Sequence, residues 1–439
     1  MRVLIVTVAE KTNFLNMVPL GWALRACGHD VLVASQPELG PVASGTGLPY
    51  TSVGRDHGFW RIMRLSRPAG APSVDVPLFQ GLEEPFEEIS WDRLLGGYRE
   101  VVPWWWRTVN DPMLEDLVAL CRRWRPDLVL WEPIAFAAPI AAEATGAVHA
   151  RFLWGVDLLG GMREAYLRAM DAQPEGERRD PLGEWMGRHA ARWGVEFRER
   201  MTRGYFTLDY LPEPLRLQDA PGVRYVPLRY IPYNGRAVVP DWLLTPPERP
   251  RVCLTLGTSA TERQGGYSVP VKDILESLAD LDAEIVATLP DAERAHLGTL
   301  PPNVRPIGFT PLEPLARTCS AVINHGGAGT VLTMLDHGVP QVIVPRMQFD
   351  EKFMAAGVER AGAALVLGAR SAVGGREVRE AVVRVLSDPA LRRGAAGARD
   401  LMHALPAPSA FVDTLVEEVR AARRTKDSPH LSGTPGHTP

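Results

Sequence analysis

The stretch Ser320–Gly338, SAVINHGGAGTVLTMLDHG, decides the fold class of this chain. Its first five residues predict a buried strand, and the apolar residues of its second half recur at helical spacing up to the final glycine. Between strand and helix lies the loop HGGAGT. Glycines let the backbone approach a ligand closely, and a helix start offers N–H groups and a positive dipole end. The stretch therefore predicts an anion site in an α/β domain.

The side chains of this loop suit a phosphate group. His325 can donate a hydrogen bond to a phosphate oxygen, and Thr330 adds a hydroxyl. The loop lacks the Gly-Lys-Ser/Thr of a Walker loop, and it is not a G-x-G-x-x-G dinucleotide fingerprint. A tight strand-to-helix turn without a ligand is the alternative interpretation.

The alternation of strands and helices continues on both sides of this stretch. The strand-like runs are RVLIVTV, VLVAS, WRPDLVLWEP, VHARFLW, VCLTLG, AEIVATLP, NVRPIGF, SAVIN and QVIVP. Helical runs between them predict parallel sheets covered by helices, and a proline-rich segment at 233–250 interrupts the pattern. We therefore predict two α/β domains that face a central cleft, with the boundaries 1–232, linker 233–250, 251–408, a helix at 409–425 and a disordered tail at 426–439.

Composition and charge argue against several classes of protein. The chain has 439 residues, 46% hydrophobic and 23% charged, with a net charge of −4. General disorder is excluded, and nucleic-acid or membrane partners are disfavoured because they need clustered lysine and arginine. The longest early apolar run, Val3–Ala9, is too short for a signal peptide or a membrane span, and the four cysteines lack zinc or redox spacing. We therefore expect a cytoplasmic protein.

Taken together, the motifs resemble the family 1 inverting glycosyltransferases, which have the two-domain glycosyltransferase B (GT-B) fold. The resemblance rests on HGGAGT, GVPQVIVP and the acidic pair in QFDEKF, and it extends through MRVLIVTV, DPLGEW at 180–185, RYIPYNG and RVCLTLGTSATER over nearly the whole chain. In this combination the chain is similar to actinomycete antibiotic glycosyltransferases that use dTDP-deoxysugars, especially activator-dependent macrolide enzymes such as desosaminyl and mycaminosyl transferases.

The resemblance implies a dTDP-deoxysugar as donor substrate, with no cofactor and no metal. Phe309 would stack on the nucleobase, with a core phenylalanine as the alternative. Asp350 and Glu351 would bind sugar hydroxyls; a carboxylate only accepts, so Glu351 could favour an amino sugar, and a solvated helix start is its alternative. The diphosphate would be held by Thr258, Ser259 and Arg263 on one side and by Asn324, His325, Gly326, Gly327, Gly329 and Thr330 on the other. The pair Asp280 and Asp282 has the spacing of a metal motif but is interpreted as a solvated turn.

The general base is the point where the chain departs from the family. The family's catalytic histidine corresponds to Asn13, and an amide cannot accept the proton of an attacking hydroxyl. Glu132, at the position of the family's orienting carboxylate, or Asp157 could take over, although a capping or salt-bridged role is the alternative for Glu132. Two further explanations stay open: an activated aromatic carbon as acceptor, which gives a C-glycoside, or a non-catalytic subunit that binds sugar nucleotides.

The acceptor implied by the resemblance is a hydrophobic polyketide aglycone. The segment 55–110 is rich in aromatic residues, and we expect Trp60, Phe79 and Trp91 to contact the acceptor, with core packing as the alternative. The segment 163–200 corresponds to the region peculiar to activator-dependent members, which implies a helper protein resembling a cytochrome P450; a solvated surface helix is the alternative. A homodimer is a further partner state left open.

Overall fold

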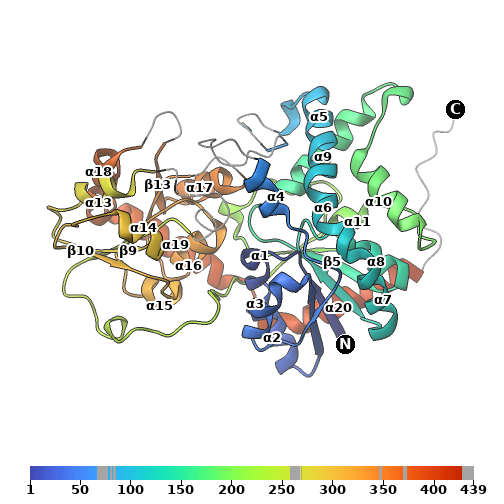
Figure 1. The fold of residues 1–439 in the computed structure, drawn as a ribbon, viewed down its shortest axis with the longest axis horizontal. Coiled ribbons are helices and arrows are strands. Elements are labelled where there is room, and N and C mark those ends of the chain that lie inside the picture. Colours follow the sequence, from blue (N-terminus) through green and yellow to red (C-terminus); the bar gives the residue numbers. More distant parts are fainter. Residues whose placement is uncertain are drawn as a thin grey trace.

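The computed structural model describes residues 1–66, 78–79, 82, 86–257, 267, 269–345, 349–368 and 373–427. These residues form two α/β domains that lie side by side, the first coloured blue to green and the second mainly yellow to orange (Figure 1). Each domain is built around its own parallel sheet. The predicted fold class is therefore confirmed.

The first sheet has the order β3-β2-β1-β4-β5-β6-β7, and its neighbouring strands are parallel. The central strands β1 and β4 are almost wholly apolar and buried, because helices cover both faces of the sheet. The strands are β1 (Arg2–Val6), β2 (Asp30–Ser35), β3 (Tyr50–Ser52), β4 (Leu128–Trp131), β5 (Val148–Phe152), β6 (Thr207–Asp209) and β7 (Tyr225–Pro227). Three of them, β3, β6 and β7, have no counterpart among the strand-like runs of the sequence.

The helices of the first domain follow the predicted apolar periodicity. The helix α8, for example, is buried along most of its length and ends at Gly146, whose φ of 80° suits a glycine. The helices are α1 (Lys11–Leu15), α2 (Val18–Ala26), α3 (Gly40–Gly45), α4 (Phe59–Ser66), α5 (Trp91–Val101), α6 (Arg107–Asn110), α7 (Leu114–Trp124), α8 (Ala137–Thr145), α9 (Leu158–Asp171), α10 (Pro181–Ala191) and α11 (Arg200–Arg203). Short 3₁₀ or π turns are η1 (Pro37–Leu39), η2 (Phe86–Glu88), η3 (Val102–Trp106), η4 (Asp111–Met113), η5 (Glu175–Glu177), η6 (Glu213–Leu215) and η7 (Asp241–Leu243).

The second sheet has the order β10-β9-β8-β11-β12-β13 and is also parallel. Its strands are β8 (Arg251–Thr255), β9 (Glu284–Thr288), β10 (Val304–Ile307), β11 (Ala321–Asn324), β12 (Gln341–Ile343) and β13 (Ala364–Val366). The helices that follow the linker are α13 (Val271–Ser277), α14 (Asp291–His296), α15 (Leu312–Ala316), α16 (Ala328–Asp336), α17 (Glu351–Arg360), α18 (Gly375–Ser387), α19 (Pro389–Ala404) and α20 (Pro408–Asp427). The quoted stretch thus becomes β11, the loop and α16.

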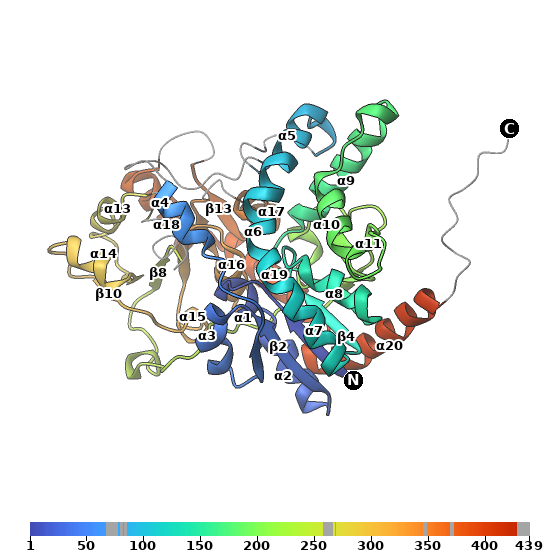
Figure 2. The same cartoon turned by 45° about the vertical axis from the view of Figure 1, so that its right-hand side comes forward.

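The last helix, α20, returns from the second domain and packs on the first, where Figure 2 shows it running below β4 and α7. Its Glu418 accepts a hydrogen bond of 2.8 Å from Nε of Arg224. The two chain segments that connect the domains lie together, because the N–H of Arg229 donates to the carbonyl of Pro406 at 2.8 Å. The helix ends at Asp427, so the first two residues of the expected tail are helical, and residues 428–439 lie outside the described part.

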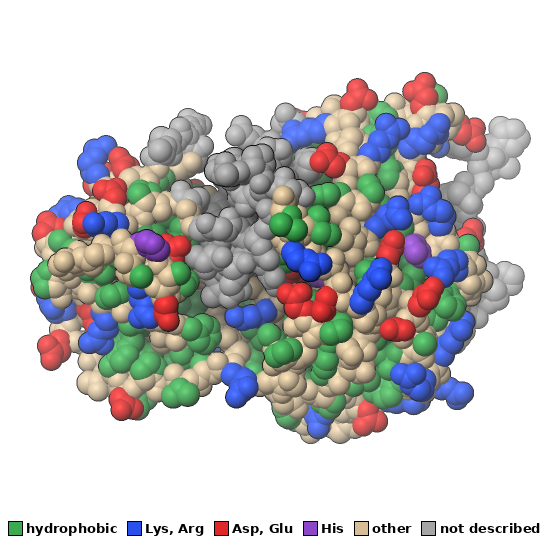
Figure 3. Space-filling model, in the orientation of Figure 1, with side chains coloured by type: hydrophobic (Ala, Val, Ile, Leu, Met, Phe, Trp, Pro, Cys, Tyr) green, Lys and Arg blue, Asp and Glu red, His purple; other side chains and the backbone are tan. Residues whose placement is uncertain are grey.

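The two domains contact each other across the cleft. Phe79 of the first domain lies beside Phe349 of the second, with ring centroids 5.9 Å apart, and Phe86 lies 5.8 Å from Phe353 in the same way. On the face drawn in Figure 3, acidic and basic side chains are interspersed rather than gathered by sign. Among the described residues, these two aromatic pairs are thus part of the contact between the domains.

Candidate active site

The topology of each sheet points to one place for a ligand. In the first sheet the strand order reverses between β1 and β4, and in the second it reverses between β8 and β11. Ligands of open parallel sheets bind at such a switch point, outside the carboxyl ends of the strands. The loops that leave β1, β4, β8 and β11 therefore define the candidate site. Of the described residues singled out in the sequence, Glu132 follows β4, and His325, Gly326 and Gly327 follow β11.

Asn324, the last residue of β11, holds the conformation of the loop that follows this strand. This side chain is fully buried; its Oδ1 accepts the N–H of Gly326 at 2.8 Å, and its Nδ2 donates to Gln341 at 2.7 Å. The direct nucleotide contact that we expected of Asn324 is not supported by this position. Its amide is used to hold the loop conformation, in which Gly326 has a φ of 87°.

The imidazole of His325 is wedged between two glycines. A Cβ atom at Gly257 would lie 2.6 Å from Cε1 of the ring, and one at Gly327 would lie 2.5 Å from Nε2. Both distances are below those that real Cβ atoms show, so neither glycine can be replaced without displacing the ring. His325 is only 7% exposed, and its orientation is fixed by this packing. Gly257, which fixes one face of the histidine, was missed in the sequence because it lies in another strand's loop.

The helix α16 begins at the end of this loop. Its N-cap residue is Gly327, which has no side chain to cap the helix, and the N–H groups of Thr330 and Val331 bond back to its carbonyl at 3.0 Å. The amides of the first turn, with Gly329 among them, are therefore presented at the switch point of the second sheet. Thr258, Ser259 and Arg263, expected on the other side of the diphosphate, lie outside the described residues.

The acidic pair lies at the start of α17. Oδ2 of Asp350 accepts the N–H of Val156, in the first domain, at 3.0 Å, and a Cβ atom at Gly155 would collide with the same oxygen. Burial raises the pKa of Asp350 to about 7. Glu351 is 6% exposed and accepts the N–H of Phe349 at 3.0 Å, so the alternative of a solvated helix start is wrong for this residue.

Phe309 stands at the edge of the second domain, between β10 and α15. It is 60% exposed, and the alternative of a core phenylalanine is therefore wrong. The ammonium nitrogen of Lys11, in the first domain, lies 5.7 Å from the centre of its ring. An exposed aromatic face at the cleft has the geometry that stacking on a nucleobase requires.

Across the cleft, Glu132 and Asn13 lie together. The carboxylate of Glu132 accepts the N–H of Val8 at 3.2 Å and that of Ile134 at 3.1 Å, and the Asn13 side chain is hydrogen-bonded to it as well. Glu132 is 0% exposed, and burial raises its pKa to about 8. The structure thus brings together the two positions that the resemblance pairs, and the bonds from Val8 and Ile134 also give Glu132 a structural role.

We expect the free energy of unfolding of the wild-type protein to fall, relative to that of the Glu132→Gln variant, as the pH rises from about 5 to about 9. The pKa of Glu132 in the folded protein is about 8, against 4.5 for an ordinary glutamate, so folding favours the protonated form. The stability contributed by this group is complete below pH 4.5 and is lost as the pH passes 8. The relative loss should be on the order of 2 to 4 kcal/mol, measured by urea unfolding across this range.

Glu143→Gln is the matched control for that measurement, because Glu143 is also a buried glutamate of the first domain. Burial opposes its ionisation, but hydrogen bonds from His149 and Arg200 overcome this and hold its pKa below the usual range. Its stabilising contribution is therefore lost only at more acidic pH, and the difference from wild type should be flat between about pH 5 and 9. A flat difference for Glu132→Gln would contradict the raised pKa.

Family models for erythromycin biosynthesis protein CIII-like proteins match this chain, the N-terminal domain model at residues 22–257 and the C-terminal domain model at residues 272–418. The chain belongs to the erythromycin biosynthesis protein CIII-like family. It is 43% identical to "10-deoxymethynolide desosaminyltransferase" of Streptomyces venezuelae, with 97% of this chain and 98% of the relative covered. It is 42% identical to "tylactone mycaminosyltransferase" of Streptomyces fradiae, with 97% and 93% covered.

The solved structures agree with this assignment. "Glycosyltransferase VinC in complex with dTDP" is 35% identical and superposes with a TM-score of 0.84 over 97% of this chain and 100% of that chain. "Spinosyn forosaminyltransferase SpnP" is 33% identical, with a TM-score of 0.77 over 96% of this chain and 99% of that chain. The CIII-like chain is therefore a glycosyltransferase of the GT-B fold, and the resemblance is confirmed.

In this CIII-like chain the carboxylate of Asp157 interacts with three donor groups. It caps α9 through the N–H of Gly160 at 2.9 Å, accepts the hydroxyl of Tyr225 at 2.7 Å and forms an ion pair with Arg151. It lines the edge of the small cavity between the domains, but its carboxylate is used within the first domain. Its position supports a structural role more strongly than the role of a base.

The three aromatic residues expected at the acceptor have different surroundings. Phe79 lines an interdomain cavity of about 20 Å³, together with Trp105 and Asp350. Trp60 lies beside the loop after β1, where its indole N–H donates to Glu10. Trp91 packs on Tyr166, with ring centroids 5.3 Å apart, in the contact between α5 and α9. The position of Trp91 thus favours core packing, its alternative interpretation. Phe79 and Trp60 lie beside the cleft.

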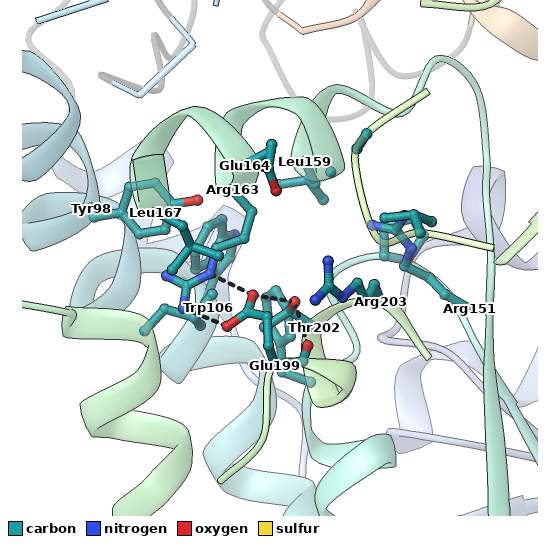
Figure 4. Close-up of a pocket in the computed structure, with 16 residues that line it drawn as sticks. Tyr98, Trp106, Arg151, Leu159, Arg163, Glu164, Leu167, Glu199, Thr202 and Arg203 are labelled. Atoms are coloured by element: carbon teal, nitrogen blue, oxygen red, sulfur yellow. Dashed lines mark hydrogen bonds and ion pairs between the residues drawn. The ribbon is translucent and has the colours of Figure 1, made fainter. Parts of the chain in front are cut away.

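The segment 163–200 of the CIII-like chain is bound into the first domain. Arg163 is buried and donates to Asp180 at 2.8 and 2.6 Å. It also donates to Glu199 at 2.8 and 2.9 Å, the contact drawn in Figure 4. In the DPLGEW motif, Asp180 caps α10 and the buried Trp185 donates to Asp111 at 3.0 Å. The alternative of a solvated surface helix is therefore wrong for this part of the segment.

The described residues also bear on metal binding and on membrane insertion. Among them, no group of three or more histidine, cysteine, aspartate or glutamate side chains is placed to hold a metal ion. Asp280 forms an ion pair with Arg379 on the surface, which agrees with a solvated turn. Within the same residues, no helix combines the length and apolar character needed to span a membrane.

Proposed function

We propose that this glycosyltransferase moves a deoxysugar from a dTDP-sugar to a polyketide-derived aglycone, with inversion and without a metal ion. The observation that carries the proposal is the donor site of the second domain, where a rigidly packed His325 precedes the N-terminus of α16. It is supported by the relatives, which are named for macrolide and anthracycline sugar transfer, and by the VinC structure, which contains dTDP.

The reaction would be a single displacement at the anomeric carbon. The acceptor oxygen forms a bond to this carbon while the bond to the β-phosphate oxygen breaks, and the electron pair leaves with dTDP. His325 and the first-turn amides of α16 would stabilise the charge that develops on the diphosphate. Phe309 would stack on thymine, and Asp350 would hold a sugar hydroxyl. Glu351 could accept from an amino group of the sugar.

Mass spectrometry of the products tests this function. The purified chain is incubated with dTDP-deoxysugars, with and without an amino group, and with a macrolactone or an anthracyclinone. We expect the aglycone to gain the mass of one sugar, also in the presence of EDTA. NMR of the product then reads the anomeric configuration and distinguishes an O-glycoside from a C-glycoside.

A cytochrome P450-like activator, a homodimer and a cytoplasmic location belong to the same proposal. Each incubation is therefore run with and without a candidate activator, and the chain's oligomeric state is measured by light scattering. Sugar transfer with any activator supports the enzyme. If dTDP binds but no sugar is transferred in any arm, the chain is a non-catalytic sugar-nucleotide-binding subunit instead.

A further inference from the structure

The loop between β1 and α1 carries a second carboxylate that the sequence did not single out. Glu10 is half-buried and is the N-cap residue of α1, but its side chain does not cap the helix. Its backbone carbonyl accepts the N–H groups of Asn13 and Phe14 at 3.2 Å, as the carbonyl of an N-cap residue ordinarily does. The Glu10 carboxylate makes no capping bond and accepts the indole N–H of Trp60.

Contacts on both sides place this loop at the cleft. Lys11, the next residue, reaches the ring of Phe309 in the second domain at 5.7 Å. The indole N–H of Trp60, on α4, donates to Oε1 of Glu10. The loop also leaves the carboxyl end of β1, at the switch point of the first sheet. Glu10 thus lies where an acceptor bound against the first domain would meet a donor bound to the second.

The neighbouring polar groups cannot perform the same task. Glu132 lies close enough for the charge of Glu10 to raise its pKa, yet it is 0% exposed and bonded to two backbone amides. Asn13 cannot take up a proton. Asp157 is occupied by Arg151, Tyr225 and the start of α9.

We propose that Glu10 is the general base of the transfer reaction, held in place by Trp60. The proposal rests on the proposed function and names the group that replaces the missing histidine. As the acceptor oxygen bonds to the anomeric carbon, its proton passes to the Glu10 carboxylate, and the sugar's bond to the diphosphate breaks with its electron pair on dTDP. Glu10 then releases the proton to water. Inverting glycoside hydrolysis likewise uses a carboxylate to deprotonate an incoming oxygen.

The central test is the variant Glu10→Gln, compared with wild type for aglycone glycosylation. We expect kcat to fall by about 100-fold or more, the range that general base catalysis contributes. The KM for the aglycone should change little, and the dissociation constant of dTDP, which binds the other domain, should not change. Glu38→Gln is the matched control, because Glu38 follows the neighbouring strand β2 at the same edge of the sheet and is exposed.

The pH profile of kcat/KM gives a second readout. The wild-type rate should fall toward acidic pH as Glu10 becomes protonated, and this limb should be missing in Glu10→Gln. Asp350 and Glu132 titrate nearby, with pKa values of about 7 and about 8, so the readout is the difference between variant and wild type. Trp60→Phe keeps an aromatic ring but removes the indole N–H, and it should move the acidic limb to higher pH because the carboxylate loses a hydrogen-bond donor.

The outcomes separate this inference from the proposed function. If wild type transfers no sugar in any arm, the function fails. If wild type is active and Glu10→Gln stays within about threefold of it, or keeps the acidic limb, Glu10 is not the base. Should Glu10→Gln fail to fold, as judged by circular dichroism and thermal unfolding, an unchanged kcat and pH profile in Trp60→Phe overturns the assignment by itself.

Discussion

Replacing His325 by alanine is expected to weaken dTDP binding by about 10- to 100-fold, the equivalent of one hydrogen bond to a charged group. The ring lies at the N-terminus of α16 and is 7% exposed, so little solvent competes for its donor. Its packing between Gly257 and Gly327 fixes its direction before the ligand arrives. Little ordering entropy would then be lost on binding. Isothermal titration with dTDP measures the change.

The matched control is His337→Ala. His337 lies at the opposite end of α16, where it is near Glu313 rather than the loop. Its removal should leave the dissociation constant of dTDP within about twofold of wild type, because the helix dipole favours anions only at the N-terminal end. An unaltered affinity in His325→Ala, with both variants folded, would refute the assignment of the anion site.

The variant Gly155→Ala is expected to lower kcat/KM for sugar transfer by about 10- to 100-fold, because small misplacements of a substrate-holding group have effects of this size. The added methyl would collide with Oδ2 of Asp350. The carboxylate must then leave the N–H of Val156, which breaks a hydrogen bond between the domains and moves the group that would hold the sugar. Steady-state kinetics with the full donor measures the loss.

Affinity for dTDP separates this effect from a general loss of structure. Since dTDP lacks the transferred sugar that Asp350 would hold, its dissociation constant in Gly155→Ala should remain within about threefold of wild type. Gly96→Ala is the control, because a methyl at this position in α5 would have no atom within 4 Å. Normal transfer kinetics in Gly155→Ala would show that the contact between Val156 and Asp350 does not position the reacting groups.

Local patterns predicted the architecture because strands and helices are specified by neighbouring residues. The runs of buried apolar residues were sufficient to predict two parallel sheets, and the glycine-rich loop to predict that a strand is followed there by a helix. The strands β6 and β7, with three residues each, were too short to give a periodic signal. Their pairing is decided by tertiary contacts rather than by sequence pattern.

The site could be predicted only as far as one loop determines it. The sequence singled out the loop around His325 as the donor side, which stays a prediction, but the packing of Gly257 on this histidine depends on the pairing of β8 with β11. The partner of Asp350 is Val156, 194 residues away, and no local pattern can indicate a contact between domains. The burial of Glu132 and the direction of Glu10 also follow from packing against other segments. The one signal for Glu10 was its place directly after the first strand.

The return of α20 has a mechanical consequence. The chain passes between the domains twice, and the bond from Arg229 to Pro406 holds these two passages side by side. Two passages at one point act as a pivot: the domains can swing about it, while sliding and twisting are resisted. During such a rotation, the displacement of a residue grows with its distance from the pivot. A small rotation about this point would therefore change the width of the cleft most where the two domains lie farthest from the two passages.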